Sequence, residues 1–204
     1  GTGEKLTAGL RKMLQPNYPE MEIRRIETIG PKVGDELKTS ALQAILIALG
    51  LVLIYITFRF QWRQGIAAII TLLHDVMVVV GIFSIFDKEF TLPVIAALLT
   101  VVGYSLNDTI VIFDRIRENI SKFRKRELLP LINQSVTETL SRTLLTSGTT
   151  LMVVLALVFL GGEIIHDFAF ALLVGVLIGT YSSIYVASPT VLWLTKIAPP
   201  KTSD

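Results

Sequence analysis

Long apolar runs separated by short polar joints make up most of the chain. A hydrocarbon core about 30 Å thick needs about 20 apolar residues in a helix that rises 1.5 Å per residue. Five runs are near or above that length, so the pattern predicts an all-α polytopic membrane protein. The predicted transmembrane helices are 40–58, 65–86, 91–113, 143–160 and 168–194.

Composition agrees with this fold class. Hydrophobic residues make up 51% of the chain and charged residues 18%, which excludes a disordered or nucleic-acid-binding protein. The net charge of +2 is too small to indicate an acidic partner. There is no cysteine, no metal-ligand spacing, no phosphate loop and no nucleophile triad. We therefore expect no nucleic-acid partner, no metal, no cofactor and no enzymatic activity.

The first 39 residues differ from the rest of the chain. Leu6, Leu10 and Met13 are spaced for one face of a helix, and residues 21–29 (MEIRRIETI) are strand-like. We expect residues 1–39 to be the C-terminal part of a small α+β domain outside the membrane, preceding a transmembrane bundle at 40–195.

Basic residues in the joints predict the orientation, because Lys and Arg resist translocation. The segment 114–142 carries seven of them, whereas 87–89 has one and 161–167 none. We expect the loop 114–142 and the tail 196–204 to be cytoplasmic, and the N-terminal segment to be external. That segment has no signal peptide, so we expect an upstream helix or a larger fused protein.

One carboxylate lies inside the third predicted helix, where an ionisable side chain costs about 2.5–3.5 kcal/mol on insertion scales. This residue, Asp108, shares a helical face with Tyr104, Asn107 and Val111, so the face should point into the bundle. Burial favours a protonated carboxyl and a nearby cation favours the charged form. Asp108 is therefore a candidate proton relay, in preference to a static helix–helix hydrogen bond.

A cation for Asp108 is available at the start of the fourth predicted helix. Arg142 precedes a polar opening, RTLLTSGTT, whose hydroxyls could act as relay points. The alternative is that Arg142 only extends to lipid phosphates. The residues by themselves leave both open.

The second predicted helix carries His74 and Asp75 in its middle. Adjacent side chains point about 100° apart, so the two cannot face one partner. A structural polar contact is at least as well supported as a relay. His166 and Asp167 indicate an ordinary interfacial joint, with Asp167 near an N-cap. Small residues recur every four positions along the fifth helix and predict close packing. They are Gly175, Gly179, Ser183 and Ala187.

Several of these stretches resemble the SecF subunits of the SecD/SecF family, within the resistance-nodulation-division superfamily. GYSLNDTIVIFDRIREN, beginning at Gly103, is similar to the signature of the family's fourth transmembrane helix. LLHDV is similar to its third helix, RTLLTSGTTLMVV to the start of its fifth, and RRIETIGPKVGDEL to the lead out of its periplasmic domain. The family's first helix and its Asp-Phe-Thr-Gly-Gly stretch are absent, so the five predicted helices would be its second to sixth.

The resemblance implies a function. Family members pair with SecD, act with the SecYEG translocon on a translocating preprotein, and use the proton-motive force late in export. The family's intramembrane acid and arginine correspond to Asp108 and Arg142, with Asn107, Thr109 and Thr146 as supports. The resemblance also implies a lipid-embedded protein of the bacterial inner membrane. A proton-coupled small-molecule exporter of the same superfamily and a structural scaffold of the translocon remain alternatives.

Overall fold

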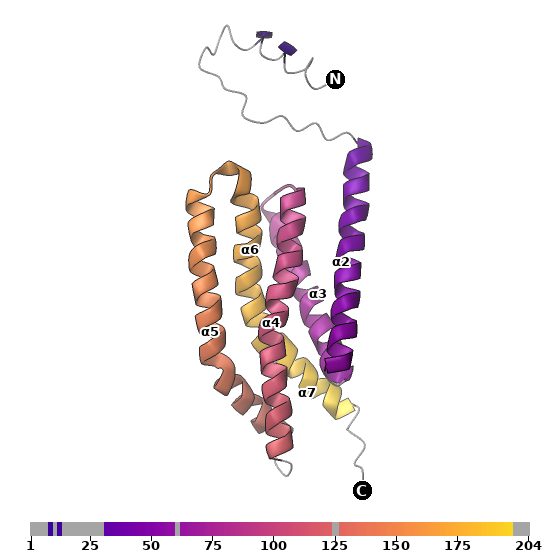
Figure 1. The fold of residues 1–204 in the computed structure, drawn as a ribbon, viewed down its shortest axis with the longest axis vertical. Coiled ribbons are helices and arrows are strands. Elements are labelled where there is room, and N and C mark those ends of the chain that lie inside the picture. The colour runs from indigo at the N-terminus through magenta and orange to yellow at the C-terminus, as the bar shows by residue number, and fades with distance from the viewer. Residues whose placement is uncertain (1–7, 10–11, 14–30, 60–61, 124–126, 198–204) are drawn as a thin grey trace. The chain divides into compact units, whose positions relative to one another are not determined.

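The described part of the chain is all-α. The computed structural model describes residues 8–9, 12–13, 31–59, 62–123 and 127–197, and none of these is in a strand. The strand expected at 21–29 lies outside the described residues. The chain divides into two compact units, 1–43 and 44–204. The helices, shown in Figure 1, are α2 (Pro31–Arg59), α3 (Trp62–Ile85), α4 (Leu92–Lys122), α5 (Leu128–Leu160), α6 (Glu163–Ser182), the π-helical turn η1 (Ser183–Ala187) and α7 (Ser188–Ile197).

Four helical segments of the described chain are long and apolar enough to cross a membrane. They are α3, α4, α5 and the continuous run from α6 through α7. The first predicted transmembrane helix falls within α2, whose shorter apolar stretch is Gln43–Ile56. The prediction of a polytopic α-helical membrane protein is confirmed.

Two helices run further than their apolar residues indicated. α4 continues to Lys122 instead of ending at Phe113, and α5 begins at Leu128 instead of Thr143. Amphipathic helices remain stable outside lipid when one face is packed, so hydropathy marks the membrane part and not the helix end. At 1.5 Å per residue, α4 and α5 are roughly 46 and 50 Å long, well beyond a 30 Å hydrocarbon core. Most of the segment 114–142 is therefore helical.

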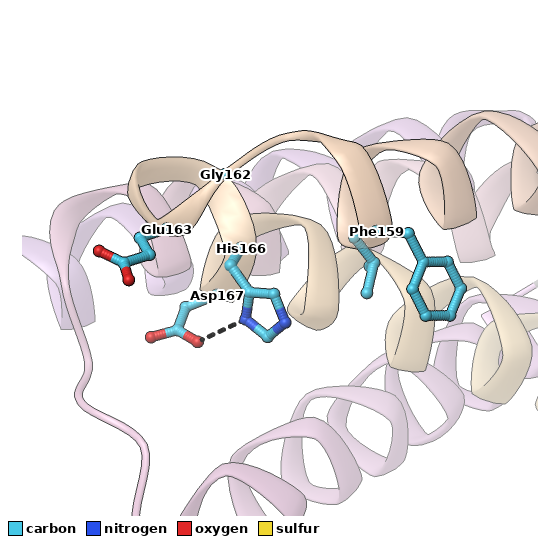
Figure 2. A pocket seen from close by; sticks show the side chains of 6 residues that line it. Phe159, Gly162, Glu163, His166 and Asp167 are labelled. Carbon is cyan, nitrogen blue, oxygen red and sulfur yellow. Dashed lines mark hydrogen bonds and ion pairs between the residues drawn. The ribbon is translucent and has the colours of Figure 1, made fainter.

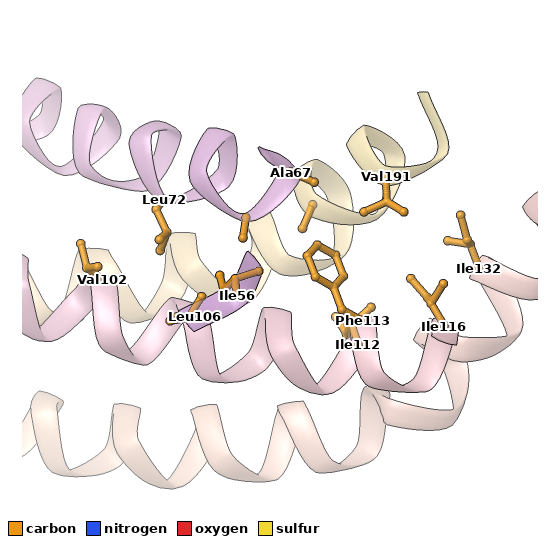
Figure 3. Packing of buried hydrophobic residues seen from close by; sticks show 12 residues of the cluster. Ile56, Ala67, Leu72, Val102, Leu106, Ile112, Phe113, Ile116, Ile132 and Val191 are labelled. Carbon is orange, nitrogen blue, oxygen red and sulfur yellow. The ribbon is translucent and has the colours of Figure 1, made fainter. Parts of the chain in front are cut away.

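α4 packs against α3, α5 and α6 and so lies at the centre of unit 44–204. One apolar cluster joins α4 to the α3 and α7 side (Figure 3). Its largest buried members include Leu72, Ile112 and Phe113. A second cluster, around Phe83 and Val94, fills the other end of the α3–α4 contact and reaches Ala171 of α6. Asp75 lies between the two clusters along α3, after Leu72 of the first and before Val79 of the second.

The predicted small-residue stripe brings α6 against α4. A Cβ on Gly175 would collide with the Val101 side chain, and one on Gly179 would lie 3.0 Å from Cβ of Ser105. Close packing of this kind brings the two backbones together and permits contacts between short hydroxyl side chains. The prediction that these glycines serve packing agrees with this geometry.

Candidate functional site

Asp108 lies on the face of α4 that points into the bundle. Its side chain is 3% exposed, and Ser147 of α5 donates a hydrogen bond from Oγ to Asp108 Oδ2 at 3.3 Å. The carboxylate lies about halfway along α4, 16 residues after Leu92 and 14 before Lys122. Asp108 is therefore a buried acid deep in the bundle with one weak hydroxyl contact among the described residues.

Ser147 is the point where three helices meet around this acid. It accepts a hydrogen bond from Thr180 of α6 at 2.7 Å. The Tyr104 hydroxyl on α4 lies 3.5 Å from Ser147 Oγ and 3.3 Å from Thr150 Oγ1. Each hydroxyl here can both donate and accept, so the group can reorient its hydrogen bonds without moving the helices.

Arg142 acts on Asp108 without touching it. The Arg142 side chain is exposed, and its guanidinium is close enough to interact electrostatically with the Asp108 carboxylate. Among the ion pairs that the described residues form, none joins the two side chains within 4.0 Å. An arginine with several rotatable bonds can change its distance to a carboxylate by rotamer changes alone. The arrangement is a cation beside a buried acid, with Ser147 as the direct partner.

The second buried acid, Asp75, has a fuller set of contacts. Its side chain is 1% exposed, and its Oδ2 accepts hydrogen bonds from Ser105 of α4 at 2.5 Å and Ser182 of α6 at 2.8 Å. Nδ1 of the neighbouring His74 lies 3.0 Å from Asp75 Oδ1. Residues from α3, α4 and α6 therefore converge on one carboxyl group, and Asp75 joins all three helices.

Hydroxyls at the π-helical turn link the surroundings of the two acids. Ser183 Oγ lies 2.9 Å from Thr109 Oγ1, next to Asp108 in the chain. Ser183 also contacts the backbone carbonyl of Ser105 at 3.4 Å. Because the second contact ends on a carbonyl, which carries no proton, the link is mechanical and does not form an unbroken chain of proton carriers.

Three predicted supporting residues take different places. Asn107 is exposed and forms no hydrogen bond with a described residue, whereas Thr109 is 1% exposed and contacts Ser183 of η1. Thr146 donates to backbone carbonyls of its own helix, at Arg142 and Thr143. The neighbouring Thr143 Oγ1 is buried and has no hydrogen-bond partner in the described structure.

Several hydroxyl residues near the two acids were not predicted from the sequence. Short hydroxyl side chains in an apolar helix are tolerated and common, so each alone gives little signal. A usable signal was their helical spacing relative to the acids: Ser105 precedes Asp108 by three residues, and Ser182 lies beside the small-residue stripe. The residues that were not predicted are Ser105, Thr180 and Ser182, whereas Ser147 belongs to the polar opening RTLLTSGTT, whose hydroxyls were predicted as relay points.

The predicted external joint is separate from both acids. Lys88 Nζ lies 2.5 Å from Asp167 Oδ1 and joins the α3–α4 connection to α6. Asp167 lies inside α6, whose N-cap is Gly162 with φ of 73°, so the expectation of Asp167 near the N-cap is wrong by several residues. A cavity of about 340 Å³ opens beside it (Figure 2), lined by Val158, Phe159, Gly162, Glu163, His166 and Asp167.

The chain is similar to membrane proteins of protein export. The family model "Protein export membrane protein SecD/SecF, C-terminal" matches residues 10–197. The chain is 54% identical over 188 residues to protein translocase subunit SecF of Desulfurispirillum indicum, covering 90% of this chain and 60% of the relative. It is 56% identical over 174 residues to the SecF of Vibrio alginolyticus, covering 85% and 55%. The chain thus spans little more than half the length of these relatives.

Two solved structures of SecDF superpose on most of this chain. The crystal structure of SecDF, a translocon-associated membrane protein from Thermus thermophilus, superposes with a TM-score of 0.82 at 48% identity. That match covers 91% of this chain and 26% of SecDF. SecDF in a super-membrane-facing form gives a TM-score of 0.78 at 44% identity, covering 93% and 26%. Together with the matches above, this similarity over most of the sequence places the chain in the SecD/SecF family of protein-export membrane proteins.

Proposed function

We propose that this chain is part of a proton-coupled, non-hydrolytic accessory subunit of the Sec protein-export machinery in the bacterial inner membrane. Its relatives are named as translocase subunits SecF and SecDF. This chain covers 26% of the SecDF of Thermus thermophilus, a larger protein. That match supports a SecD-type partner, which would correspond to a part of SecDF that this chain does not cover. Preprotein is the proposed cargo and the Sec translocon the proposed site of action.

The observation that carries the proton coupling is Asp108, a buried acid with a guanidinium beside it. Intramembrane acids of this kind serve pumps and transporters as proton carriers. Asp108 accepts only one hydrogen bond from the described residues, at 3.3 Å, so protonation breaks few contacts. Loss of the negative charge would release Arg142 from electrostatic attraction, and this change in charge is the proposed driving event for helix movement.

The unpartnered hydroxyl of Thr143 supports access of water to this region. A buried hydroxyl without a partner is costly, and such groups commonly bind water. Thr143 is one turn before Ser147 on α5, so water held there would lie between the cytoplasmic side and the Asp108 contact. We propose that protons leave or reach Asp108 along this side of α5.

The test is Asp108→Asn in the full-length protein with its partner. The amide is nearly isosteric but cannot carry a proton, so proton-motive-force-dependent stimulation of export should be lost while the complex still assembles. Export is measured as preprotein protected from protease in inverted membrane vesicles, with and without a proton gradient. Asp75→Asn is the matched control in the same bundle. Normal stimulation in the Asp108→Asn protein would favour a structural scaffold and contradict the proposal.

A further inference from the structure

A group of polar contacts joins α4 to α5 well away from Asp108. Asn119 is 2% exposed and donates to Ser135 Oγ at 2.9 Å and to Glu138 Oε2 at 3.0 Å. Arg115 Nε donates to the same Glu138 oxygen at 2.6 Å. We call Arg115, Asn119, Ser135 and Glu138 the cytoplasmic clasp, because they lie in the part of the two helices expected outside the membrane. The proposed proton path does not use them.

The clasp and the acid belong to one continuous antiparallel contact. Between the Asn119–Ser135 and Asp108–Ser147 contacts, the chain moves back 11 residues along α4 and forward 12 along α5. Nearly equal steps mean that the two helices keep one register from the clasp to Asp108.

Arg142 lies between the two ends of this contact. It follows Glu138 by four residues, one helical turn or about 6 Å along the axis, and precedes Ser147 by five residues, about 7.5 Å. Glu followed by Arg four residues later is the favourable orientation for an ion pair on a helix. Arg142 thus has a carboxylate on each side, Glu138 toward the helix end and Asp108 toward the bundle interior.

Glu138 has room for a further donor. Arg115 and Asn119 bind its Oε2, and Gln134 donates to its Oε1 at 2.8 Å. A carboxylate offers about four acceptor positions, so one remains. Hydrogen bonds from Asn119, Gln134 and Arg115 lower the pKa of Glu138 to about 2, which keeps it charged at neutral pH. Its charge is therefore constant, whereas that of Asp108 changes in the proposed cycle.

We propose that Glu138 is a second acceptor for the Arg142 guanidinium, so that Arg142 moves from Asp108 to Glu138 when Asp108 is protonated. This inference rests on the proposed proton coupling and adds a positioning residue to it. Arg115 and Asn119 hold Glu138 in place for the exchange. The other titratable groups near Asp108 have partners of their own: Asp75 with His74 on α3, and Tyr104 with α5 hydroxyls. α6 presents Thr180 and η1 presents Ser183, and neither carries a charge.

The first test compares two carboxylates that both pair with Arg115. Glu138→Gln keeps the size of the side chain and one acceptor oxygen, but it removes the negative charge one helical turn from Arg142. Glu118→Gln removes the other Arg115 partner, which contacts Arg115 at 2.5 Å but lies on α4. In the full-length complex, the ratio of export with and without a proton gradient should fall about 1.5- to 2-fold for Glu138→Gln, the size of a helical ion pair. Glu118→Gln should leave the ratio unchanged, and equal ratios in the two variants would overturn the proposal.

A charge exchange separates a positioning role from a static one. Arg115→Glu combined with Glu138→Arg can rebuild the clasp pair, but it places an arginine one turn from Arg142, where like charges repel. If Glu138 serves only to tie the helices together, the double variant restores the ratio, and the proposal is wrong. If Glu138 accepts Arg142, the ratio stays at or below that of Glu138→Gln while the complex is recovered in normal amount.

Glu138→Asp covers the case in which Glu138→Gln accumulates poorly. The shorter acid keeps the charge and should retain a ratio closer to that of the unmodified protein, whereas a loss equal to that of Gln would show that charge is not involved. The experiments distinguish a failure of the proton coupling at Asp108 from a failure of the role of Glu138. A normal ratio in Asp108→Asn contradicts the proton coupling itself, whereas a lost ratio there with a normal one in Glu138→Gln contradicts only the role of Glu138.

Discussion

The two buried acids of the bundle have opposite surroundings. Asp75 is held by hydroxyls from α4 and α6 at 2.5 and 2.8 Å and by His74 at 3.0 Å. Asp108, only one turn from Ser105 along α4, accepts one hydrogen bond from a hydroxyl at 3.3 Å and has the exposed Arg142 guanidinium nearby. Both are at most 3% exposed, so burial alone does not distinguish them.

The two acids differ in the number of hydrogen-bond donors around them and in the helices that supply these donors. A change in the protonation of Asp75 would disturb contacts among three helices at once. A change in the protonation of Asp108 would alter one hydrogen bond, from Ser147, and one electrostatic attraction, to Arg142. A protein that must change shape on proton transfer needs the second kind of acid, and needs the first kind to stay fixed while it does so.

The largest expected difference is in stability. Asp75→Ala removes the acceptor of two buried hydroxyls and leaves a small cavity, so we expect it to lower the free energy of unfolding by about 2–4 kcal/mol. Asp108→Ala should cost only about 1 kcal/mol, because it removes one weak contact. Unfolding of the purified complex in detergent, followed by helical circular dichroism, measures both. Equal losses would remove the distinction between the two acids.

A change at the cation should affect only the Asp108 side. Arg142→Lys keeps the charge but loses the planar, delocalised guanidinium. We expect the ratio of export with and without a proton gradient to fall roughly fivefold, equivalent to about 1 kcal/mol. The unfolding midpoint should not move, since Arg142 forms no ion pair with a described residue. Unchanged export would indicate that Arg142 serves lipid phosphates instead.

The donors allow a smaller comparison. Ser105→Ala removes the shorter hydrogen bond to Asp75 and should cost about 1 kcal/mol of stability, near the upper end for hydroxyl bonds between membrane helices. Ser147→Ala removes the longer bond to Asp108, and Thr180, which donates to Ser147, can donate instead to the Val176 carbonyl at 2.8 Å, so the loss of stability should be smaller. The ratio of export with and without a proton gradient should still fall about twofold, since an alanine cannot relay a proton to Asp108. Unfolding and export of both variants are measured in parallel. A larger stability loss in Ser147→Ala would reverse the assignment.

The smallest effect is expected for Asp75→Asn. The amide oxygen can accept from both Ser105 and Ser182, and its NH2 can donate to the other tautomer of His74. The free energy of unfolding should change by less than about 0.5 kcal/mol. The ratio of export with and without a proton gradient should stay close to that of the unmodified protein. A loss of the ratio as complete as that expected for Asp108→Asn would make Asp75 a second proton carrier.

The fold was largely predictable because hydropathy decides which segments cross a membrane. Asp108 and Asp75 were identifiable for the same reason, since an acid in an apolar helix is costly and therefore conspicuous. The continuation of α4 to Lys122 and the start of α5 at Leu128 were not predicted, because outside lipid these residues are polar and only their packing shows them to be helical.

The contacts that distinguish the two acids were not predictable from the sequence. Helical periodicity places Asn107 on nearly the same face as Asp108, but the structure leaves Asn107 exposed and buries Thr109. A face is wide in angle, and only the positions of α5 and α6 decide which of its residues are covered. Ser182 and Asp75 are 107 residues apart, and no local pattern connects them.

The π-helical turn at Ser183–Ala187 has a further consequence for how the last helix meets the core. A π turn accommodates one extra residue relative to an α-helix, so every later side chain is rotated by about 100° around the axis. Ala187 and Val191 lie in the apolar cluster with that rotation, and an uninterrupted helix of the same sequence would point them elsewhere. The turn therefore sets the angular phase of α7, and moving it by a few residues along the chain would exchange one packed face of the helix for another.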